Sequence, residues 1–270
     1  MNLFIITHKE VKNIYPIGRN IMMVGASNKK VPQGYLSDYA SNNNISSKNP
    51  YFCELTGLYY MLNNYEDEVV GLEHYRRLFV KNAFGFSKDK FLQSNDVKDL
   101  LDDYDLIMPK KVFFVKKVYD QYASSHYKSD LDKTREIISQ KYPTYVDAFD
   151  DVMKQRKLYL YNMFIGKSEI IKSYADWLFD ILFELEKQID ISDRDNYQKR
   201  VFGFLSERLF NVWLKKHDEV KIVERSVRKI PNKALTEEKV EYRPTVRKKK
   251  KIKLTIVRWK LPFFPWQFGY

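Results

Sequence analysis

Short apolar runs alternate with longer segments of helical periodicity along most of the chain. The apolar runs predict strands at 3–7, 21–24, 69–72, 106–108 and 158–165. Apolar residues recur at helical spacing in 50–63, in a segment that begins at Ser168, and from about Arg200 to Lys216. The stretch 117–155 is predicted to be mostly helical, with a break at Pro143. This alternation predicts the α/β class, with a mostly parallel central sheet flanked by helices.

Turn and capping residues separate these elements. The polar stretch 28–48 is predicted to be a loop, and Asn49 with Pro50 is a favourable helix start. Periodicity is lost at 231, where a basic and aromatic segment begins. We therefore expect one folded domain over residues 1–230 and a C-terminal tail over 231–270.

Composition limits the compartment and the class. The chain has 270 residues, of which 44% are hydrophobic, enough for a sizeable core. Its single cysteine, Cys53, excludes an intrachain disulfide and suits a reducing compartment. The apolar run near the start is too short for a signal peptide, and no stretch approaches the ~20 apolar residues of a membrane span. These features predict a cytoplasmic protein.

The net charge of +12 is concentrated near the end of the sequence. Residues 221–270 hold 15 Lys and Arg against 4 Asp and Glu, which leaves 32 against 31 in the rest. A nucleic-acid-binding domain usually carries its positive face on the folded body. The nearly neutral body therefore disfavours a nucleic-acid-binding module, although the tail keeps that alternative open.

Charged side chains follow two of the predicted strands directly. His74, Arg76 and Arg77 come after the strand at 69–72, and Lys110 comes after the strand at 106–108. Ligands of open α/β sheets bind beyond the carboxyl ends of strands, and guanidinium groups match phosphate oxygens. The pattern indicates a diphosphate site, and a solvated basic turn is the alternative.

Familiar catalytic motifs are absent from the sequence. It contains no phosphate-binding loop, no dinucleotide fingerprint, and no histidines at metal-ligand spacing. Three Asp-x-Asp triplets occur, and Asp103 with Asp105 is the candidate we retain for a divalent cation such as Mg²⁺ or Mn²⁺. Such triplets also arise by chance in a chain with 35 acidic residues. No cofactor is therefore required by the sequence.

Six motifs in a fixed order resemble those of a known family. They lie at 44–50, 54–56, 71–77, 105–110, 161–164 and 200–208. Together they resemble a bacterial family of capsule and lipopolysaccharide glycosyltransferases, long described as a domain of unknown function. Characterised members are similar to galactofuranosyltransferases that use UDP-galactofuranose. The resemblance spans about residues 1–230 and implies a GT-A-like nucleotide-sugar-binding fold.

The chain departs from that family at one position and lacks a familiar GT-A feature. Asn43 stands where the family usually has an aspartate, which puts a donor- or metal-binding role there in doubt. The usual metal motif is absent after the strand at 69–72. Arg76 and Arg77 could instead neutralise a leaving diphosphate with fixed charge.

The resemblance implies a hexosyltransferase, with inversion favoured, in which a carboxylate deprotonates the acceptor hydroxyl. Asp195 is the first candidate for this base and Glu207 the second. The expected donor-binding residues are Thr7, His8 and Lys9 for the nucleoside, His74, Arg76, Arg77 and Lys110 for the diphosphate, and Asn162 and Met163 for the sugar. Arg208 either binds the donor or forms a surface ion pair with Glu207.

The acceptor and the attachment to the membrane follow from the same resemblance. A capsule enzyme is expected to act on a lipid-linked oligosaccharide at the inner face of the bacterial plasma membrane. The lysines and aromatic residues of 231–270 suit an anionic bilayer surface. The alternatives are a tail packed on the body or on another subunit, and a transferase that uses another UDP-sugar or a sugar-phosphate donor.

Overall fold

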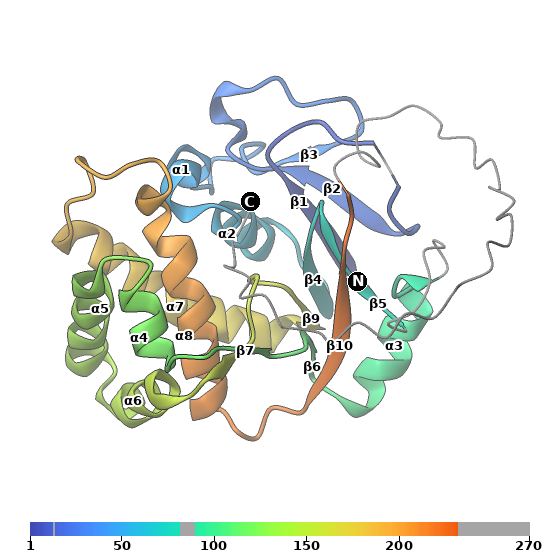
Figure 1. The fold of residues 1–270 in the computed structure, drawn as a ribbon. Helices are drawn as coiled ribbons and strands as arrows, with labels where there is room; N and C mark the ends of the chain where they lie inside the picture. The colour runs from blue at the N-terminus through green and yellow to red at the C-terminus, as the bar shows by residue number, and fades with distance from the viewer. Residues whose placement is uncertain (13, 82–89, 232–270) are drawn as a thin grey trace, which may run out of the picture. The chain divides into compact units, whose positions relative to one another are not determined.

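The computed structural model describes residues 1–12, 14–81 and 90–231 (Figure 1). A central eight-stranded sheet is built from β1 (Asn2–Thr7), β2 (Arg19–Met23), β3 (Leu36–Ser37), β4 (Val69–His74), β5 (Arg77–Val80), β6 (Leu106–Pro109), β9 (Phe164–Lys167) and β10 (Ile222–Lys229). A second, two-stranded sheet pairs β7 (Val112–Phe113) with β8 (Lys157–Leu158). The predicted α/β class is therefore confirmed.

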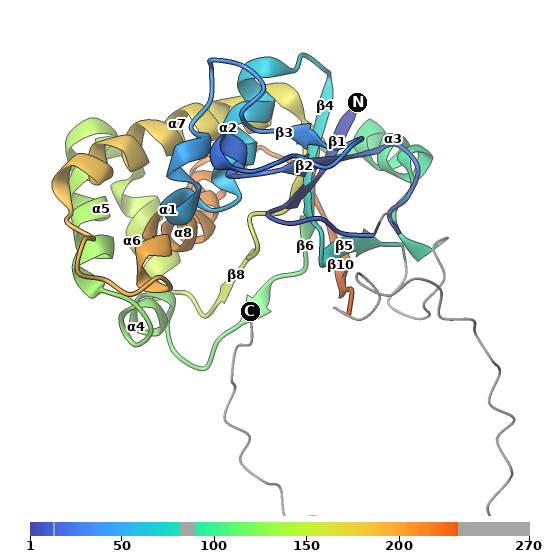
Figure 2. The same cartoon turned by 90° about the horizontal axis from the view of Figure 1, so that it is seen from above.

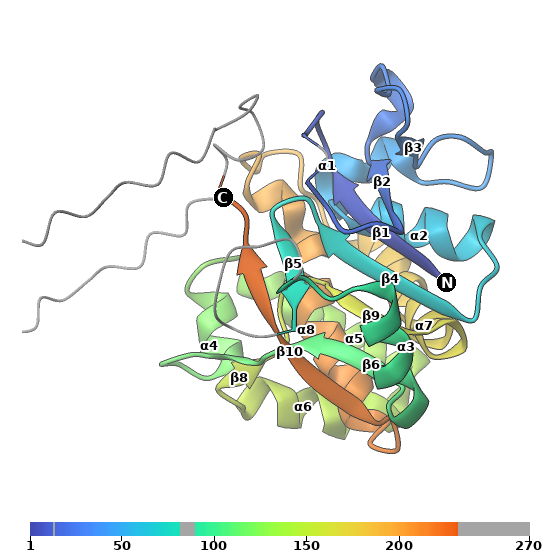
Figure 3. The same cartoon turned by 90° about the vertical axis from the view of Figure 1, so that its right-hand side faces the viewer.

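Strand directions bring most carboxyl ends to one edge of the large sheet. β1, β2, β3 and β4 are parallel neighbours, and β6 is parallel to β10. β9 lies between β4 and β6 and runs antiparallel to both, while β5 runs antiparallel to β10 (Figure 3). The carboxyl ends of β1, β4, β6 and β10 therefore share an edge. Only β5 and β9 run against the other strands, so the prediction of a mostly parallel sheet is confirmed in part, and the sheet is mixed.

Helices cover the two faces of the sheet unequally (Figure 2). One face packs its apolar side chains, such as Phe4, Leu72 and Phe164, into the main core beneath several helices. Those helices are α1 (Asn49–Phe52), α2 (Leu55–Asn64), α4 (Val118–Ala123), α5 (Lys128–Lys141), α6 (Val146–Lys154), α7 (Ser168–Gln188) and α8 (Val201–Lys216). The other face is covered in part by α3 (Ser94–Asp103), with Leu3 and Ile165 beneath it.

Two predicted elements are interrupted where the backbone takes a left-handed conformation. The helix predicted over 50–63 is split at Cys53, whose φ is 52°, into α1 and α2. The strand predicted over 158–165 is β8 followed by a turn at Tyr161 and Asn162, and then β9. Positive φ values are uncommon outside glycine and give no hydropathy signal. The prediction from apolar runs therefore joined α1 to α2 and β8 to β9.

The strand after 217 was missed by the sequence analysis. β10 inserts between β5 and β6, with only partly buried side chains, so its hydropathy is weak. Among the described residues no helix is long and apolar enough to cross a membrane. The predicted tail over 231–270 lies almost wholly outside the described residues and stays a prediction.

Candidate active site

The carboxyl ends of β1, β4 and β6 and the start of β9 meet at one edge of the sheet. Here His74, the last residue of β4, donates from Nε2 to the carbonyl oxygen of Tyr161 at 2.5 Å. Burial lowers the pKa of His74, so the imidazole is neutral near pH 7 and Nε2 carries the hydrogen. This hydrogen bond ties the end of β4 to the turn that precedes β9.

The turn before β9 consists of Tyr161 and Asn162, whose φ values are 77° and 48°. Asn162 donates from Nδ2 to Glu54 Oε1 at 2.7 Å and to the carbonyl oxygen of Gly203 at 3.3 Å. Its Oδ1 is buried and accepts no hydrogen bond from any residue that the structure describes. A buried amide oxygen without a donor is costly, so Asn162 Oδ1 is an unsatisfied polar group beside Glu54 and the turn.

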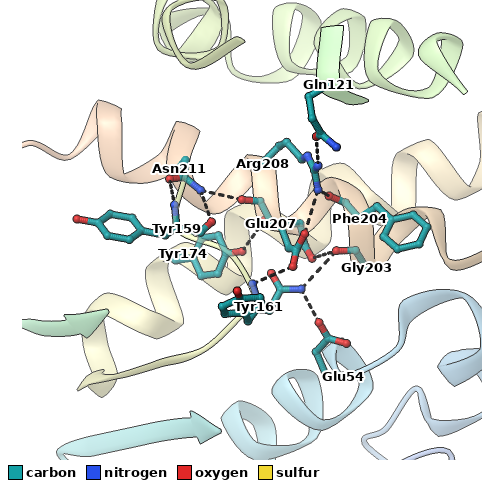
Figure 4. A network of polar contacts seen from close by, with 12 residues as sticks. Glu54, Gln121, Tyr159, Tyr161, Tyr174, Gly203, Phe204, Glu207, Arg208 and Asn211 are labelled. Carbon is teal, nitrogen blue, oxygen red and sulfur yellow. Dashed lines mark hydrogen bonds and ion pairs between the residues drawn. The ribbon is translucent and has the colours of Figure 1, made fainter. Parts of the chain in front are cut away.

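Glu207 on α8 contacts the same turn (Figure 4). Its Oε1 accepts the backbone N–H of Tyr161 at 2.8 Å, and its Oε2 pairs with Arg208 Nη1 at 3.0 Å. Burial raises the pKa of Glu207, although Arg208 and the Tyr161 N–H act in the opposite direction. The side chain is 20% exposed, so a substrate hydroxyl can approach it. A reachable carboxylate with a raised pKa is suited to general base catalysis.

Arg208 is fixed by contacts within the protein. Besides Glu207, its guanidinium donates to the carbonyl oxygen of Phe204 at 3.0 Å and to Gln121 Oε1 at 2.7 Å. The side chain is buried. These contacts orient Glu207 and balance its charge, and they do not present Arg208 to a donor.

A cluster of cations lies beside His8, just after β1. Partial burial, followed by the charges of Lys29, Lys9, Arg76 and Arg200, lowers the pKa of His8. Lys9, Lys29 and Arg76 form no ion pair with any described residue, and Arg76 Nε is buried without a partner. We call Lys9, Lys29, Arg76 and Arg200 the cation cluster. Positive charges left without carboxylates attract an anion, and a diphosphate has the matching charge.

Two tyrosines support the arginines that follow β4. Lys9 and Arg76 lie over the buried ring of Tyr75, at 5.7 and 5.1 Å from its centroid. Arg77 lies 4.6 Å from the ring centroid of Tyr161. Such cation–π contacts hold a guanidinium in place without neutralising it. Arg76 thus lies in the turn between β4 and β5, and Arg77 begins β5, both at this edge of the sheet.

Not every predicted donor-binding residue is available to a ligand. Met163 is fully buried in the core under α3, so it offers no surface to a sugar, contrary to our expectation. Thr7 is also buried, and its hydroxyl exchanges hydrogen bonds with the backbone of Lys9. Lys110 is exposed at the carboxyl end of β6 and remains a candidate.

Asp195 lies in the loop before α8. It is exposed, and its Oδ1 accepts the backbone N–H groups of Tyr197 and Gln198 at 2.8 Å each. This pattern is a local turn cap. Between the two candidate bases, the geometry favours Glu207, because Glu207 shares a hydrogen-bond network with the turn that holds Asn162.

The Asp103 and Asp105 pair lies at the opposite edge of the sheet, before β6 begins. Asp105 Oδ1 pairs with Lys167 at 2.7 Å, and its Oδ2 accepts the backbone N–H of Lys221 at 2.9 Å. Its two oxygens therefore already have cationic or N–H partners. Within residues 1–12, 14–81 and 90–231, no group of three or more His, Cys, Asp or Glu side chains could hold a metal ion.

Several residues of the site escaped the sequence analysis. Glu54 lies within one of the six motifs but was assigned to the middle of a regular helix. The break at Cys53 instead places Glu54 at the start of α2, facing Asn162. Lys29 follows a 3₁₀ turn with no strand directly in front of it, so nothing marked it, and Arg200 opens one of the six motifs but was assigned only to the start of a helix. Arg200 also donates to the sulfur of Cys53 at 3.1 Å.

Two cavities lie away from this edge. They measure about 590 and 260 Å³ and are lined mainly by α2 and α7, with Leu62, Asn63 and Lys172 common to both. Neither contains a residue of the cation cluster, Glu54 or Glu207. We therefore locate the candidate active site by its chemistry, at the carboxyl edge of the sheet.

The fold and the site together describe an α/β protein with an anion-attracting edge beside a partly buried carboxylate. A family model matches residues 2–218, and the chain belongs to that family, described as Domain of unknown function (DUF4422). The resemblance drawn from the six motifs, to a glycosyltransferase family long described in those terms, is thereby confirmed. No curated protein matches the chain.

One solved structure is similar over most of the chain. It is the apo structure of WbbM, a bifunctional glycosyltransferase, with a TM-score of 0.80 and 27% sequence identity. The match covers 85% of this chain and 45% of that chain. The chain thus spans less than half the length of that solved structure.

Proposed function

We propose that the protein is a glycosyltransferase with a GT-A-like donor site at the carboxyl edge of the sheet. The observation that carries this proposal is the cation cluster, without ion pairs at Lys9, Lys29 and Arg76, beside a network that contains Glu207. A nucleotide-sugar donor needs both parts. Its diphosphate requires positive charge, and its acceptor requires a base.

In the proposed reaction, the cation cluster binds the diphosphate of the donor. The acceptor hydroxyl gives its proton to Glu207, and its oxygen attacks the anomeric carbon of the sugar. The bond between that carbon and the diphosphate oxygen breaks, and the nucleoside diphosphate leaves with the electron pair. Fixed cations stabilise this developing charge without reorganising. Attack from the face opposite the leaving group makes the enzyme inverting.

The sugar would lie over the turn before β9. Asn162 Oδ1 is buried and accepts no hydrogen bond within the described residues, so it would meet a sugar hydroxyl only after a small shift of the turn, while Glu54 holds the Asn162 amide in place. His74 fixes the backbone of the same turn. We propose UDP-galactofuranose as the donor, on the family resemblance, and a lipid-linked oligosaccharide of capsule or cell-surface polysaccharide synthesis as the acceptor. The tail over 231–270 would hold the enzyme at the inner face of the plasma membrane.

A panel of UDP-sugars tests the proposal. Purified protein should release UDP fastest from its true donor, and UDP-galactofuranose is the expected one. Glu207→Gln should lower UDP release, whereas Glu219→Gln, at an exposed glutamate on the loop after α8, should not. UMP as the product would indicate sugar-phosphate transfer instead. The proposed glycosyltransferase activity would be refuted if the wild-type protein released nucleotide from every donor no faster than Glu207→Gln does.

A further inference from the structure

An exposed apolar segment bounded by lysines follows β6. Residues 110–117 read Lys-Lys-Val-Phe-Phe-Val-Lys-Lys. Phe113 is 71% exposed and Val115 is 84% exposed, while Phe114 between them packs against the main core. Phe113 ends β7 and Val115 lies in the bend that follows, so the two exposed apolar side chains stand on either side of the partly buried Phe114. We call Phe113 and Val115 the β7 tip.

The β7 tip is held by hydrogen bonds to the segment around β8. Phe114 N donates to the carbonyl oxygen of Arg156 at 2.6 Å, and Arg156 Nη1 returns a bond to the carbonyl oxygen of Val115 at 2.6 Å. Val118 N donates to the carbonyl oxygen of Gln155 at 2.8 Å. In Figures 2 and 3 the chain between β6 and α4 reaches outward before it returns to the helices. The tip is thus a fixed projection rather than a collapsed loop.

Cations surround the tip. Lys110, Lys111, Lys116 and Lys117 flank it in sequence and are exposed, and exposed Lys157 pairs with Phe113 in the strand register. Glu224 on β10 lies close enough to Lys111 to act on its charge, and Asp120 follows in α4. The local balance is strongly positive, in contrast to the nearly neutral body as a whole.

We propose that the β7 tip is a docking surface for an anionic lipid bilayer. Phe113 and Val115 would enter the interface at headgroup depth, and the lysines would contact anionic headgroups, with their long stems allowing the ammonium groups to stay in water. Two apolar side chains are far too few for a stable protein interface, which buries about 800 Å² on each partner. A bilayer needs only a shallow apolar insertion combined with charge.

The inference does not depend on the proposed reaction. The tip begins at the carboxyl end of β6, the edge that also carries the candidate active site. Docking there would place the site near the bilayer surface. A protein with another activity would bind vesicles in the same way.

Vesicle cosedimentation of the full chain tests the β7 tip. The partitioning of wild type and of Phe113→Ser/Val115→Ser is compared on vesicles of phosphatidylcholine with about 30% phosphatidylglycerol, because the anionic lipid supplies the negative surface potential that attracts the lysines. The partition coefficient of the double variant should fall at least about tenfold, because both apolar contacts are lost. The matched control is Ile17→Ser, at an apolar residue that is 93% exposed on a different loop. It should bind like wild type.

A second variant tests the electrostatic part. Lys116→Gln/Lys117→Gln should weaken binding to the anionic vesicles, about fivefold for each lysine removed, and this loss should vanish at 1 M salt. All variants keep residues 231–270, so the differences report the tip alone. UDP release in solution should stay at the wild-type level in each variant. Wild-type partitioning by Phe113→Ser/Val115→Ser, or no vesicle binding by the wild type, would overturn the inference.

Discussion

At the scale of single residues, mutation of Glu207 tests whether the candidate site is catalytic, because Glu207 is the proposed general base. Glu207→Gln keeps the shape of the side chain and removes the basic oxygen, and its single amide oxygen can accept from Tyr161 N–H or from Arg208 but not from both. We expect the rate of transfer to fall by about 10²–10⁴-fold, with little change in UDP affinity. Steady-state kinetics and UDP titration measure the two effects.

Asp195→Asn is the matched comparison, since Asp195 is the other carboxylate predicted as the base. Because Asp195 is exposed and caps a turn, this change should alter the rate only slightly. If Asp195→Asn abolished transfer while Glu207→Gln left it intact, the assignment of the base would be reversed.

The pH dependence of catalysis follows from the burial of Glu207. A general base works when it is deprotonated, so the rate should fall as the pH drops through its pKa. Burial raises the pKa of Glu207, which places the acid limb of kcat/KM above the ordinary value of about 4.3. Arg208 opposes this shift, so Arg208→Gln should move the limb to a higher pH. Circular dichroism checks folding, and an unmoved limb would contradict the pairing.

The cation cluster predicts a loss of charge stabilisation on mutation. Arg76→Gln removes a charge that has no carboxylate partner among the described residues and lies over the Tyr75 ring. We expect kcat/KM to fall by an amount equivalent to about 2–4 kcal/mol, as for other preorganised charges. The control is Arg225→Gln, at a partly exposed arginine on β10. Equal losses of kcat/KM in Arg76→Gln and Arg225→Gln would argue against a specific diphosphate site. Because the positive charge at the site comes from the protein itself, transfer activity should also persist in EDTA.

At the scale of elements, one close helix contact holds the two halves of the site together. α1 and α8 approach at Gly203, where a Cβ would meet Cys53 Sγ at 3.3 Å and Cys53 Cβ at 3.4 Å. The carbonyl oxygen of Gly203 also accepts the Asn162 amide, which reaches Glu54. The spacing of α1 and α8 therefore fixes the distance between Glu54 on α2 and Glu207 on α8.

A larger residue at Gly203 should separate these helices. We expect Gly203→Val to cost about 1–3 kcal/mol of unfolding free energy, since it overpacks a tight contact. Transfer activity should fall as well, because Glu54 and Asn162 would shift. Urea denaturation and the UDP-release assay measure the two effects, with Gly203→Ala as the smaller step. Full activity and stability in Gly203→Val would show that the spacing of α1 and α8 at Gly203 and Cys53 does not control the site.

At the scale of the whole molecule, the tail and the β7 tip are two proposed attachments to one membrane. A chain that ends at Val240 should float with anionic vesicles more weakly than the full chain, because two linked contacts bind more tightly than one. Adding Phe113→Ser/Val115→Ser to the shortened chain should abolish flotation. If the shortened chain floats as strongly as the full chain, residues 231–270 do not contribute to membrane binding.

The sequence by itself determined the local elements and their charged ends. The strand at 3–7, the strand at 106–108 and the helix up to Lys216 all appear where periodicity predicted them. Periodicity succeeds because burial of one face is a local property of a strand or helix. It also placed Arg76 and Arg77 after a buried strand, where Arg76 lies in a turn and Arg77 begins β5, and their role at a diphosphate stays a prediction.

The tertiary structure alone decided which of these residues meet. Two hydrogen bonds join residues that are far apart in the sequence. Asn162 and Glu54 are separated by 108 residues, and Tyr161 and Glu207 are separated by 46. Their meeting depends on left-handed residues at 53, 161 and 162 and on the antiparallel insertion of β9. Neither feature leaves a hydropathy signal. Met163 shows the same limit, because whether a side chain faces a site or the core depends on what packs against it.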